Sequence, residues 1–257
     1  MKYVVAIPTY KRVDTIIENT LKTLEESNVP PENIYIFVEN KEEYTEYNKK
    51  VPPNIYNKII IGKETLHKQR NYIRQYFQEN TNIFYIDDDI QGFYKLQKNK
   101  LIKYNKLDQL IQAGFHICKK YHSTLMGIYP VFNHFFMSNT INKGLYYVIG
   151  SAYWNINKKD KKLNVTIEDK EDYERSLKEY LYSGQVLRLN NITAKTNYYT
   201  EPGGMQETRT EDRITKSAYY LKQKYPEYVS INKARKKHTE IKFKKQENNE
   251  KIGGNNL

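Results

Sequence analysis

The sequence feature that most constrains the fold is an apolar run that ends in three consecutive carboxylates. Residues 83–86 are continuously apolar and are followed directly by Asp87, Asp88 and Asp89. The run predicts a buried strand. Three adjacent carboxylates at the end of a rigid strand repel one another, so holding them there costs free energy unless cations compensate. Mg²⁺ or Mn²⁺ is commonly held by one or two carboxylates plus substrate phosphates. We therefore expect a site for a nucleotide or nucleotide-sugar; a solvated acidic turn is the alternative.

Short apolar runs alternate with helical patterns along the rest of the chain. The predicted strands are residues 3–7, 34–38, 59–61, 83–86, 125–129, 146–149 and 186–189, and the predicted helices lie near 13–24, 66–77, 107–121, 173–181 and 211–225. This alternation predicts a parallel sheet built from right-handed crossovers. We expect an α/β fold with a mostly parallel sheet flanked by helices, in a single domain with a helical and basic C-terminal extension.

Polar residues follow four of the predicted strands at their carboxyl ends. They are residues 9–12, Glu39 with Asn40, the turn after Gly62, and the aspartate triplet. Parallel sheets bind ligands at this edge. Arg70 adds to the pattern, because an arginine on the apolar face of a helix is costly to bury without an anionic partner. Its expected partner is a triplet carboxylate or a phosphate, and a structural salt bridge is an equal alternative.

Candidate acceptor residues lie in the second half of the chain. The aromatic cluster 132–136 is either core or a platform on which a sugar or base stacks. Small residues 150–152 beside Trp154, the only tryptophan, would allow close approach of a ligand. Gly203 and Gly204 predict a mobile loop.

Two further segments carry strong charge patterns. The acidic residues of 168–174 precede a helical pattern, where capping of the helix dipole is their default role. Residues 233–245 are strongly basic and include His238, and the polar residues 246–257 predict a disordered tail.

The composition limits the class and compartment of the protein. A chain of 257 residues with 39% hydrophobic residues can bury a substantial core. The net charge of +12, from 42 Lys+Arg against 30 Asp+Glu, makes nucleic acid a possible partner, although general compositional bias would also enrich lysine. Cys118 is the only cysteine, and we see neither a signal peptide nor a membrane span. We therefore expect an intracellular, cytoplasmic protein.

Together, these motifs resemble the GT-A class of nucleotide-sugar glycosyltransferases. The matching segments are residues 6–12 (AIPTYKR), Glu39, residues 68–71 (KQRN), the Asp87–Asp89 triplet as a DxD-like metal motif, and the later acidic pair Glu171 and Asp172. The second half, with residues 171–177 (EDYERSL), 198–199 and 203–206 (GGMQ), is similar to the TET-associated glycosyltransferases of phages and large DNA viruses. Those enzymes are thought to glycosylate hydroxymethylated pyrimidines in DNA.

The resemblance implies a role for each matching residue on the donor side. Pro8, Thr9 and Arg12 would contact the nucleotide, Glu39 its base or ribose, and Arg70 the diphosphate or the triplet. Asp87 and Asp88 would bind the nucleotide-sugar, most simply a UDP-sugar. Asp87 and Asp89 would hold Mn²⁺ or Mg²⁺, and His238 is a candidate for a further metal ligand. In this scheme residues 1–95 form the donor half of a 1–245 domain and residues 96–245 the acceptor half.

On the acceptor side, the resemblance makes Asp172 the general base that deprotonates the acceptor hydroxyl. Asp169 stands in an identical Glu-Asp pair three residues earlier and is the alternative base. Trp154, Glu171, Gly203 and Gly204 would face the acceptor.

The leading hypothesis is therefore an inverting, metal-dependent glycosyltransferase that acts on hydroxymethylated pyrimidines in DNA. The same chemistry on a glycan or protein acceptor is the first alternative. A non-catalytic nucleic-acid-binding protein on a degenerate transferase fold is the second, and a nucleotidyltransferase is the third.

Overall fold

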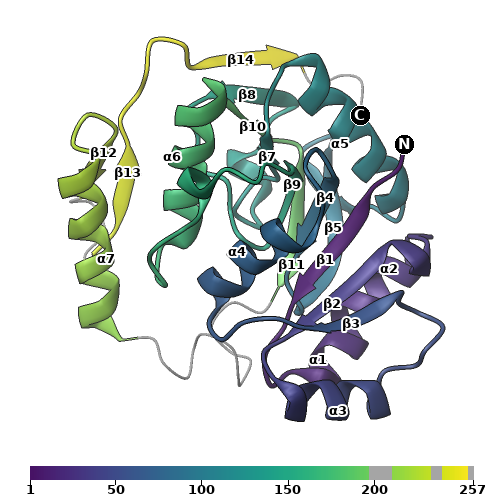
Figure 1. The fold of residues 1–257 in the computed structure, drawn as a ribbon. Coiled ribbons are helices and arrows are strands. Elements are labelled where there is room, and N and C mark those ends of the chain that lie inside the picture. The colour runs from purple at the N-terminus through teal and green to yellow at the C-terminus, as the bar shows by residue number, and fades with distance from the viewer. Residues whose placement is uncertain (197–209, 233–238, 254–257) are drawn as a thin grey trace.

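The computed structural model describes residues 1–196, 210–232 and 239–253, and these form an α/β fold (Figure 1). Within them, one nine-stranded sheet has the order β14-β8-β10-β7-β9-β4-β1-β2-β3. Its strands are β1 Val4–Pro8, β2 Ile34–Val38, β3 Lys58–Ile61, β4 Asn82–Ile86, β7 Leu125–Gly127, β8 Thr140–Gly144, β9 Ala152–Ile156, β10 Val186–Leu189 and β14 Glu250–Gly253. A three-stranded sheet contains β5 Ile90–Gln97, β6 Lys100–Lys103 and β11 Ile192–Thr196, and a two-stranded sheet contains β12 Val229–Ile231 and β13 Ile241–Phe243.

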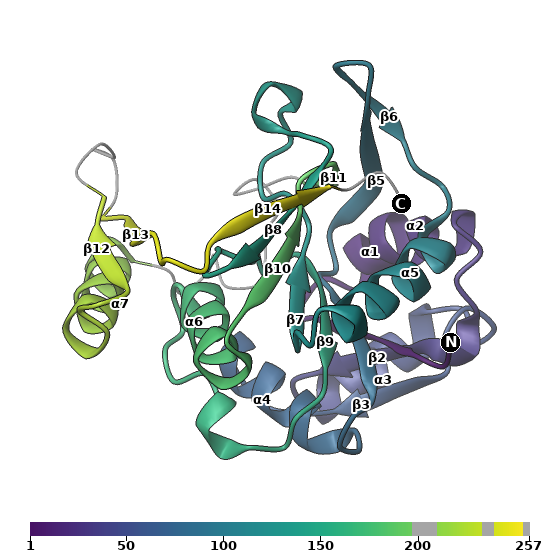
Figure 2. The same ribbon diagram turned by 90° about the horizontal axis from the view of Figure 1, so that it is seen from above.

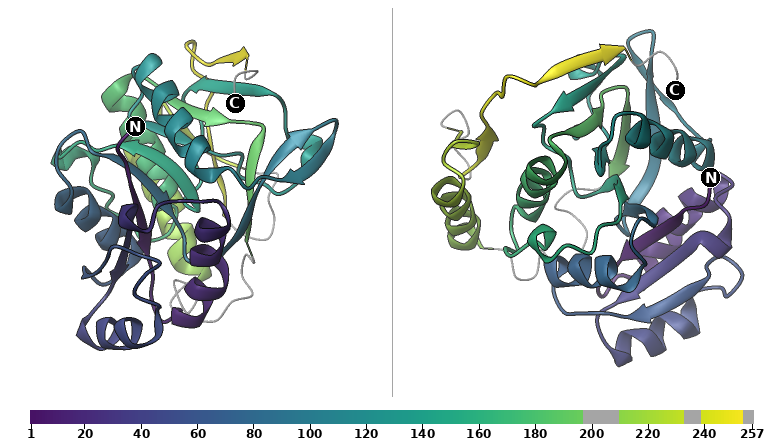
Figure 3. Two further views of the ribbon diagram at one scale, coloured as in Figure 1. Left: turned by 90° about the vertical axis from the view of Figure 1, so that its right-hand side faces the viewer. Right: turned by 45° about the horizontal axis from the view of Figure 1, so that its top comes forward.

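Helices cover both faces of the large sheet (Figure 3). Helices α1, α2, α3 and α5 pack on one face, and α4 and α6 pack on the other. A π-helical turn, Ile17–Leu21, joins α1 to α2. The helices are α1 Val13–Ile16, α2 Lys22–Glu26, α3 Lys41–Lys50, α4 Leu66–Tyr76, α5 Leu107–Lys120, α6 Glu171–Ser183 and α7 Glu211–Lys224.

The central strands read as continuous apolar runs because both of their faces are buried. In β1, Val5 and Ile7 belong to the core under α1, α2, α3 and α5, while Ala6 between them belongs to the core under α4 and α6. Side chains of a strand alternate between the two faces of the sheet, so a strand with helices on both sides needs apolar residues throughout.

Most strands of the large sheet run in one direction. β1, β2, β3 and β4 are mutually parallel, β9 is antiparallel to both β4 and β7, and β10 is parallel to β7. β8 is antiparallel to β10 and β14, so β8 and β9 run against the other seven strands. The carboxyl ends of β1, β2, β4, β7 and β10 therefore meet at one edge of the sheet. The predicted mostly parallel α/β sheet is confirmed.

The predicted C-terminal extension is partly described. Helix α7 and the β12–β13 pair pack on α6 through a small separate core that includes Leu177, Leu221, Val229 and Ile241. The tail predicted to be disordered contains an ordered strand instead, because β14 pairs antiparallel with the edge strand β8. A short polar strand at a sheet edge satisfies its backbone groups without any apolar signal.

The secondary structure also differs from the prediction at several other places. Residues 92–106, for which the sequence predicted neither strand nor helix, lie mainly in the β5–β6 hairpin, whose turn residues Lys98 and Asn99 both have positive φ, 46° and 59°. Residues 146–149 are not a strand; β8 and β9 flank them. Helix α3 was missed because its exposed face is almost wholly polar. None of the described helices is both long and apolar enough to cross a membrane.

Candidate functional site

The predicted donor residues gather at the carboxyl edge of the sheet. Pro8 ends β1, Glu39 follows β2, and the acid turn Asp87–Asp89 follows β4. Because β2 and β4 both pair with β1 in parallel, the three strand ends are neighbours. The prediction that these residues lie together at the carboxyl edge of the sheet agrees with the structure.

Asp88 is the inward-pointing member of the acid turn. Its side chain is only 7% exposed, against 32% for Asp87 and 15% for Asp89. Thr9 Oγ1 donates to Asp88 Oδ2 at 2.7 Å, and Arg12 Nη1 donates to Asp88 Oδ1 at 3.1 Å. Asp88 therefore ties the acid turn to the β1 turn, and the structure gives it this positioning contact where we expected contact with the donor.

Tyr47, which sequence reasoning missed, completes this network from α3. Its hydroxyl lies 2.7 Å from Thr9 Oγ1 and accepts a hydrogen bond from the Arg12 N–H at 3.1 Å. The side chain is fully buried. No short-range pattern marks Tyr47, because its partners lie more than 30 residues away in the chain.

Glu39 lies beside a second missed residue, Glu43. The Glu43 carboxylate accepts from the backbone N–H groups of Glu39 at 2.8 Å and Lys11 at 2.5 Å, and Asn40 caps α3 by accepting from the Glu43 N–H at 3.0 Å. Burial, the Glu43 charge and the Glu64 charge raise the pKa of Glu39. The spacing of Asn40 and Glu43 is that of a capping box, a signal that could have located α3.

The two outer carboxylates of the acid turn are partly exposed, and each lies near an arginine, Asp87 at 3.1 Å from Arg70 and Asp89 at 3.7 Å from Arg12. Burial raises the pKa of Asp87 to about 6, against the opposing charge of Arg70, with a further increase from Asp89. Burial and the charge of Asp88 raise the pKa of Asp89. Carboxylates that are this reluctant to ionise are suited to a cation that would compensate their charge.

Thr20, from the π-helical turn, holds the acid turn in place. Its hydroxyl donates to the Asp87 carbonyl at 2.7 Å and accepts from the Ile90 N–H at 2.9 Å. π-helical turns are rare and concentrate at functional sites. A π-helical turn contains one more residue than an α-helical turn, and in this segment the Thr20 side chain points toward the acid turn.

Arg70 connects α4, the acid turn and α6. Its guanidinium donates to Asp87 Oδ1 at 3.1 Å, to the Gly150 carbonyl at 3.0 Å and to Glu171. A Cβ at Gly150 would lie 2.9 Å from Arg70 Nη1, so the glycine admits the arginine. The expected carboxylate partner of Arg70 is thus confirmed, and the small residue at 150 makes room for a side chain of the protein.

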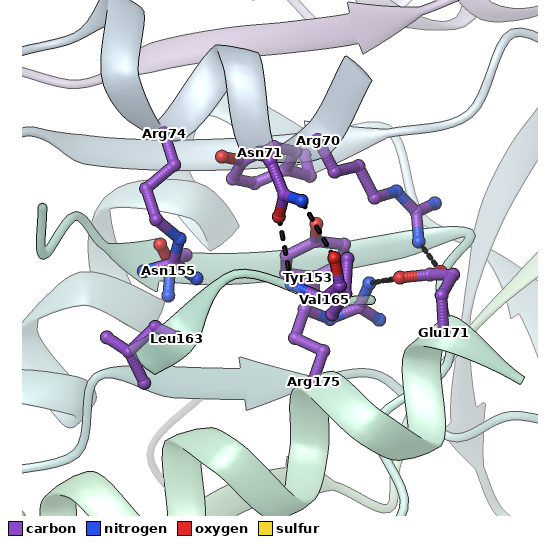
Figure 4. Close-up of a pocket in the computed structure, with 10 residues that line it drawn as sticks. Arg70, Asn71, Arg74, Tyr153, Asn155, Leu163, Val165, Glu171 and Arg175 are labelled. Atoms are coloured by element: carbon purple, nitrogen blue, oxygen red, sulfur yellow. Dashed lines mark hydrogen bonds and ion pairs between the residues drawn. The ribbon is translucent and has the colours of Figure 1, made fainter. Parts of the chain in front are cut away.

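Glu171 lies between two arginines and not on an acceptor surface (Figure 4). Arg70 contacts one of its oxygens, and Arg175 Nη1 donates to the other at 2.9 Å. The side chains of Glu171, Arg70 and Arg175 are 6%, 5% and 4% exposed. These three residues form a buried ion cluster, which links α4 to the first turn of α6.

Asp172, the next residue, is partly exposed. Tyr147 donates its hydroxyl proton to Asp172 Oδ2, and the Tyr173 N–H donates to Oδ1 at 3.0 Å. The rings of Tyr147 and Tyr173 stack at 4.3 Å. Asp169, in contrast, is fully buried and accepts from Arg213 on α7. Of the two candidate bases, only Asp172 is open to an acceptor.

The remaining predicted residues do not meet in the described site. Trp154 is fully buried on β9, and its indole N–H donates to the Ile111 carbonyl at 3.0 Å. Gly114 of α5 accommodates the indole, since a Cβ there would lie 2.3 Å from Trp154 Nε1. Trp154 therefore belongs to the core and cannot contact an acceptor. His238, Gly203 and Gly204 lie outside the described residues.

The described residues fit a divalent metal that takes part of its coordination from a ligand. Among residues 1–196, 210–232 and 239–253 there is no group of three or more His, Cys, Asp or Glu side chains placed to hold a metal ion. Asp87 and Asp89 offer two partly exposed carboxylates at the carboxyl edge of the sheet, the number that Mg²⁺ or Mn²⁺ commonly takes from protein when phosphates supply the rest. The donor set is all oxygen, as these metals prefer.

The mostly parallel sheet flanked by helices, with an acid turn after β4, has the GT-A type of fold that its structural neighbours share. Among solved structures, S. aureus TarS 1-349 in complex with UDP-GlcNAc matches with a TM-score of 0.58 and 16% identity, over 86% of this chain and 65% of that one. S. aureus TarS 1-349 alone matches with a TM-score of 0.54 and 18% identity, over 76% of this chain and 59% of that one. The complex of TarS 1-349 with UDP gives 0.51 and 17% over the same shares.

The likeness to TarS concerns the fold. The chain spans less than two thirds of these TarS chains, and its identity to them is below 20%. No protein-family model matches the chain, and no curated protein matches its sequence.

Proposed function

We propose that the protein is a metal-dependent glycosyltransferase that moves a sugar from a nucleotide-sugar to a hydroxyl acceptor. The observation that carries this proposal is the position of Arg70, whose guanidinium contacts both Asp87 and Glu171. Arg70 thereby joins the acid turn to the first turn of α6, where Asp172 lies partly exposed. A diphosphate and metal site and a candidate base thus belong to one connected structure.

The donor is bound at the edge formed by β1, β2 and β4. Pro8, Thr9 and Arg12 line the nucleotide side, and Glu39 reaches its base or ribose. Arg70 supplies positive charge near the diphosphate. A UDP-sugar is the donor that the fold comparison favours, because TarS was solved with UDP-GlcNAc and with UDP.

The metal belongs to the two outer carboxylates of the acid turn. Asp87 and Asp89 would hold Mg²⁺ or Mn²⁺, with His238 as the candidate for a further ligand. When bound, the metal stabilises negative charge on the departing diphosphate. Asp88 keeps the β1 turn and the acid turn together beneath this site.

Asp172 is the general base of the proposed reaction. It accepts the proton of the acceptor hydroxyl while the acceptor oxygen bonds to the anomeric carbon. The bond between that carbon and the diphosphate oxygen breaks, and the nucleoside diphosphate departs with the electron pair. Attack from the face opposite the leaving group inverts the anomeric centre.

The proposed acceptor is a hydroxymethylated pyrimidine in DNA. The net charge of +12 supports a polyanionic acceptor. The resemblance of residues 171–177 to the TET-associated glycosyltransferases supports a modified base. Duplex DNA would have to release this base from its stack, because a pocket at the sheet edge cannot reach a paired nucleotide.

The first experiment is thermal stabilisation by nucleoside diphosphates and their sugars in the presence of Mn²⁺. Binding to the folded state raises the melting temperature by mass action, so no knowledge of the acceptor is needed. We expect a shift with a uridine nucleotide that disappears with EDTA and in Asp89→Ala. The matched control is Asp14→Ala, since Asp14 is an exposed aspartate of α1 with a side chain 75% exposed. No shift with any nucleotide would refute the donor site.

Activity on hydroxymethylated DNA then tests the acceptor. Product is expected with the wild type and not with Asp172→Asn, while donor-induced stabilisation is retained in that variant. Glycosylation of a sugar or protein acceptor with no reaction on DNA would instead support the same chemistry on another acceptor. Donor binding without any transfer would indicate a non-catalytic relative, and pyrophosphate release from a nucleoside triphosphate would indicate a nucleotidyltransferase.

A further inference from the structure

A basic groove lies along the β5–β6 hairpin, next to the proposed active site in the chain. The groove is open, holds about 760 Å³, and lies between the hairpin, the start of α5, Asn139 and Asn191. Four lysines line it, Lys95, Lys98, Lys103 and Lys106, and no Asp or Glu does. Lys103 pairs with Glu26 of α2 at 2.9 Å, so the other three lysines carry most of the groove's charge. Residues 90–106 contain five lysines and no acidic residue. Positive charge of this density in a concave surface favours a polyanion.

The groove wall also carries amide side chains. Gln97, Asn105, Gln109, Asn139 and Asn191 complete the polar lining. Amide groups both donate and accept hydrogen bonds, which suits the edges of unpaired bases. A groove with this lining offers partners to bases as well as to phosphates.

Exposed phenylalanines stand beside the groove on the loop after β7. In this phenylalanine loop, residues 131–136, Phe135 is 80% exposed, Phe136 is 69% exposed and Phe132 is 41% exposed. The Phe132 ring packs edge-on against Tyr94 of β5 at 4.9 Å, which joins the loop to the hairpin. Large apolar side chains clustered in solvent mark an interaction surface.

The phenylalanine loop is held by its own contacts. Asn133 accepts a hydrogen bond from the Phe135 N–H at 3.1 Å, Met137 is buried, and the Ser138 N–H donates to the Asn190 carbonyl at 3.1 Å. A loop backbone that is held in one conformation lowers the entropy that is lost when a ligand binds. The sequence allowed this cluster to be either part of the core or a stacking platform. Its exposure in the structure favours the platform.

We infer that the basic groove and the phenylalanine loop bind a single-stranded nucleic acid, with lysines on its phosphates and phenylalanine rings on its bases. Stacking on aromatic side chains combined with a positive groove is the usual mode for single strands. A duplex would hide its bases from the rings. A membrane surface would use the same residue types, but its headgroups do not enter a concave, amide-lined groove.

The position of this surface suggests its purpose. β5 begins directly after the acid turn, and Lys95 lies six residues further along the strand, or about 20 Å at the rise of an extended chain. The loop and the hairpin both extend from the carboxyl edge of the sheet (Figure 2). The role of the groove as the docking surface of the acceptor strand depends on the proposed function, in which DNA is the acceptor. The binding of nucleic acid to the groove does not depend on the transferase reaction.

The test is fluorescence anisotropy with a labelled oligothymidine, measured with EDTA and without nucleotide over a range of salt concentrations. The wild type should bind with an affinity that falls as salt rises. Phe135→Ala/Phe136→Ala should weaken binding by about tenfold or more at every salt concentration, because base stacking is lost. Lys98→Gln/Lys106→Gln should weaken it and lower the slope of log K against log salt by about 1.4.

Two control variants separate local from general effects. Tyr219→Ala removes an aromatic ring that is 54% exposed on α7, and Lys119→Gln/Lys222→Gln removes two exposed lysines away from the groove. Both should bind like the wild type. If the phenylalanine variant binds as tightly as the wild type, or if charged controls lose as much affinity as the groove variant, the inference is wrong.

Other ligands complete the test. Binding to anionic phospholipid vesicles without binding to the oligonucleotide would overturn the inference and indicate a membrane surface. Absence of binding to either would overturn it as well. Oligonucleotide binding without donor-induced stabilisation would uphold the groove and refute the transferase, and the reverse result would refute the groove alone.

Discussion

The substitution Glu171→Gln removes the carboxylate that contacts both Arg70 and Arg175, two buried arginines. Gln has nearly the same shape, so packing around Arg70 and Arg175 is preserved while their charges remain. Arg70 retains Asp87 and the Gly150 carbonyl, and Arg175 retains the Val148 carbonyl and the face of the Tyr153 ring at 4.0 Å, but both lose the Glu171 charge. Breaking a buried ion pair from one side costs about 3–5 kcal/mol, because a charge is left uncompensated in the interior.

This cost is large compared with total stability. Domains are stable by only about 5–15 kcal/mol, so Glu171→Gln should lose about a fifth or more of that margin. The melting temperature should fall by roughly 6–20 °C for a chain of this size. Urea denaturation followed by the fluorescence of Trp154, the single and fully buried tryptophan, measures the loss directly.

The matched control is Glu46→Gln on α3. Glu46 pairs with Lys50 four residues later at 3.0 Å, and both side chains are more than 40% exposed. An exposed pair of this kind contributes about 0.3–0.5 kcal/mol. A loss below about 1 kcal/mol in Glu171→Gln, similar to the control, would refute the ion cluster as a structural link. If Glu171→Gln is as stable as the wild type and binds donor but no longer transfers sugar, the result would support the acceptor-side role that we first expected for Glu171.

Three further substitutions or treatments test other contacts. Thr20→Val keeps the shape of a buried threonine but leaves two backbone groups of the acid turn without their hydrogen-bond partner. The free energy of unfolding, measured with urea, should fall by about 1–3 kcal/mol. The control Thr45→Val, at an exposed site, should show almost no change. Tyr147→Phe removes a hydrogen bond to Asp172 and should lower turnover about tenfold while donor-induced stabilisation stays unchanged; an unchanged rate would remove Tyr147 from the site. Burial raises the pKa of the Cys118 thiol and hides it completely, so iodoacetamide should label it only under unfolding conditions, and rapid labelling of the native protein would contradict the packing of α5.

The sequence predicted several of the apolar strands and missed strands whose apolar pattern is interrupted, including β9, which is buried but contains Asn155. β1, β2, β4 and β10 are short apolar runs, and periodicity located each of them. β8 has the sequence TINKG, with few apolar residues to mark it. The β5–β6 turn lacks the glycine that usually marks a hairpin, because Lys98 and Asn99 adopt positive φ instead.

The site residues that could be predicted are those whose role is visible from their neighbours in the sequence. Arg70 stood out because a charged residue interrupted an apolar face, and the structure gave it the carboxylate partner that the interruption required. Tyr47 and Thr20 act through distant partners, and no spacing rule could have found them. Trp154 was misread because its accommodation depends on Gly114, a residue 40 positions away on the facing helix.

The π-helical turn Ile17–Leu21 restricts how this segment can change in length during evolution. Each residue of a helix turns the chain by about 100°. Loss or gain of one residue between Val13 and Thr20 would therefore swing the Thr20 hydroxyl more than a quarter of a turn away from the backbone of Asp87 and Ile90. Descendants that keep the acid turn should vary here by substitution and not by insertion or deletion.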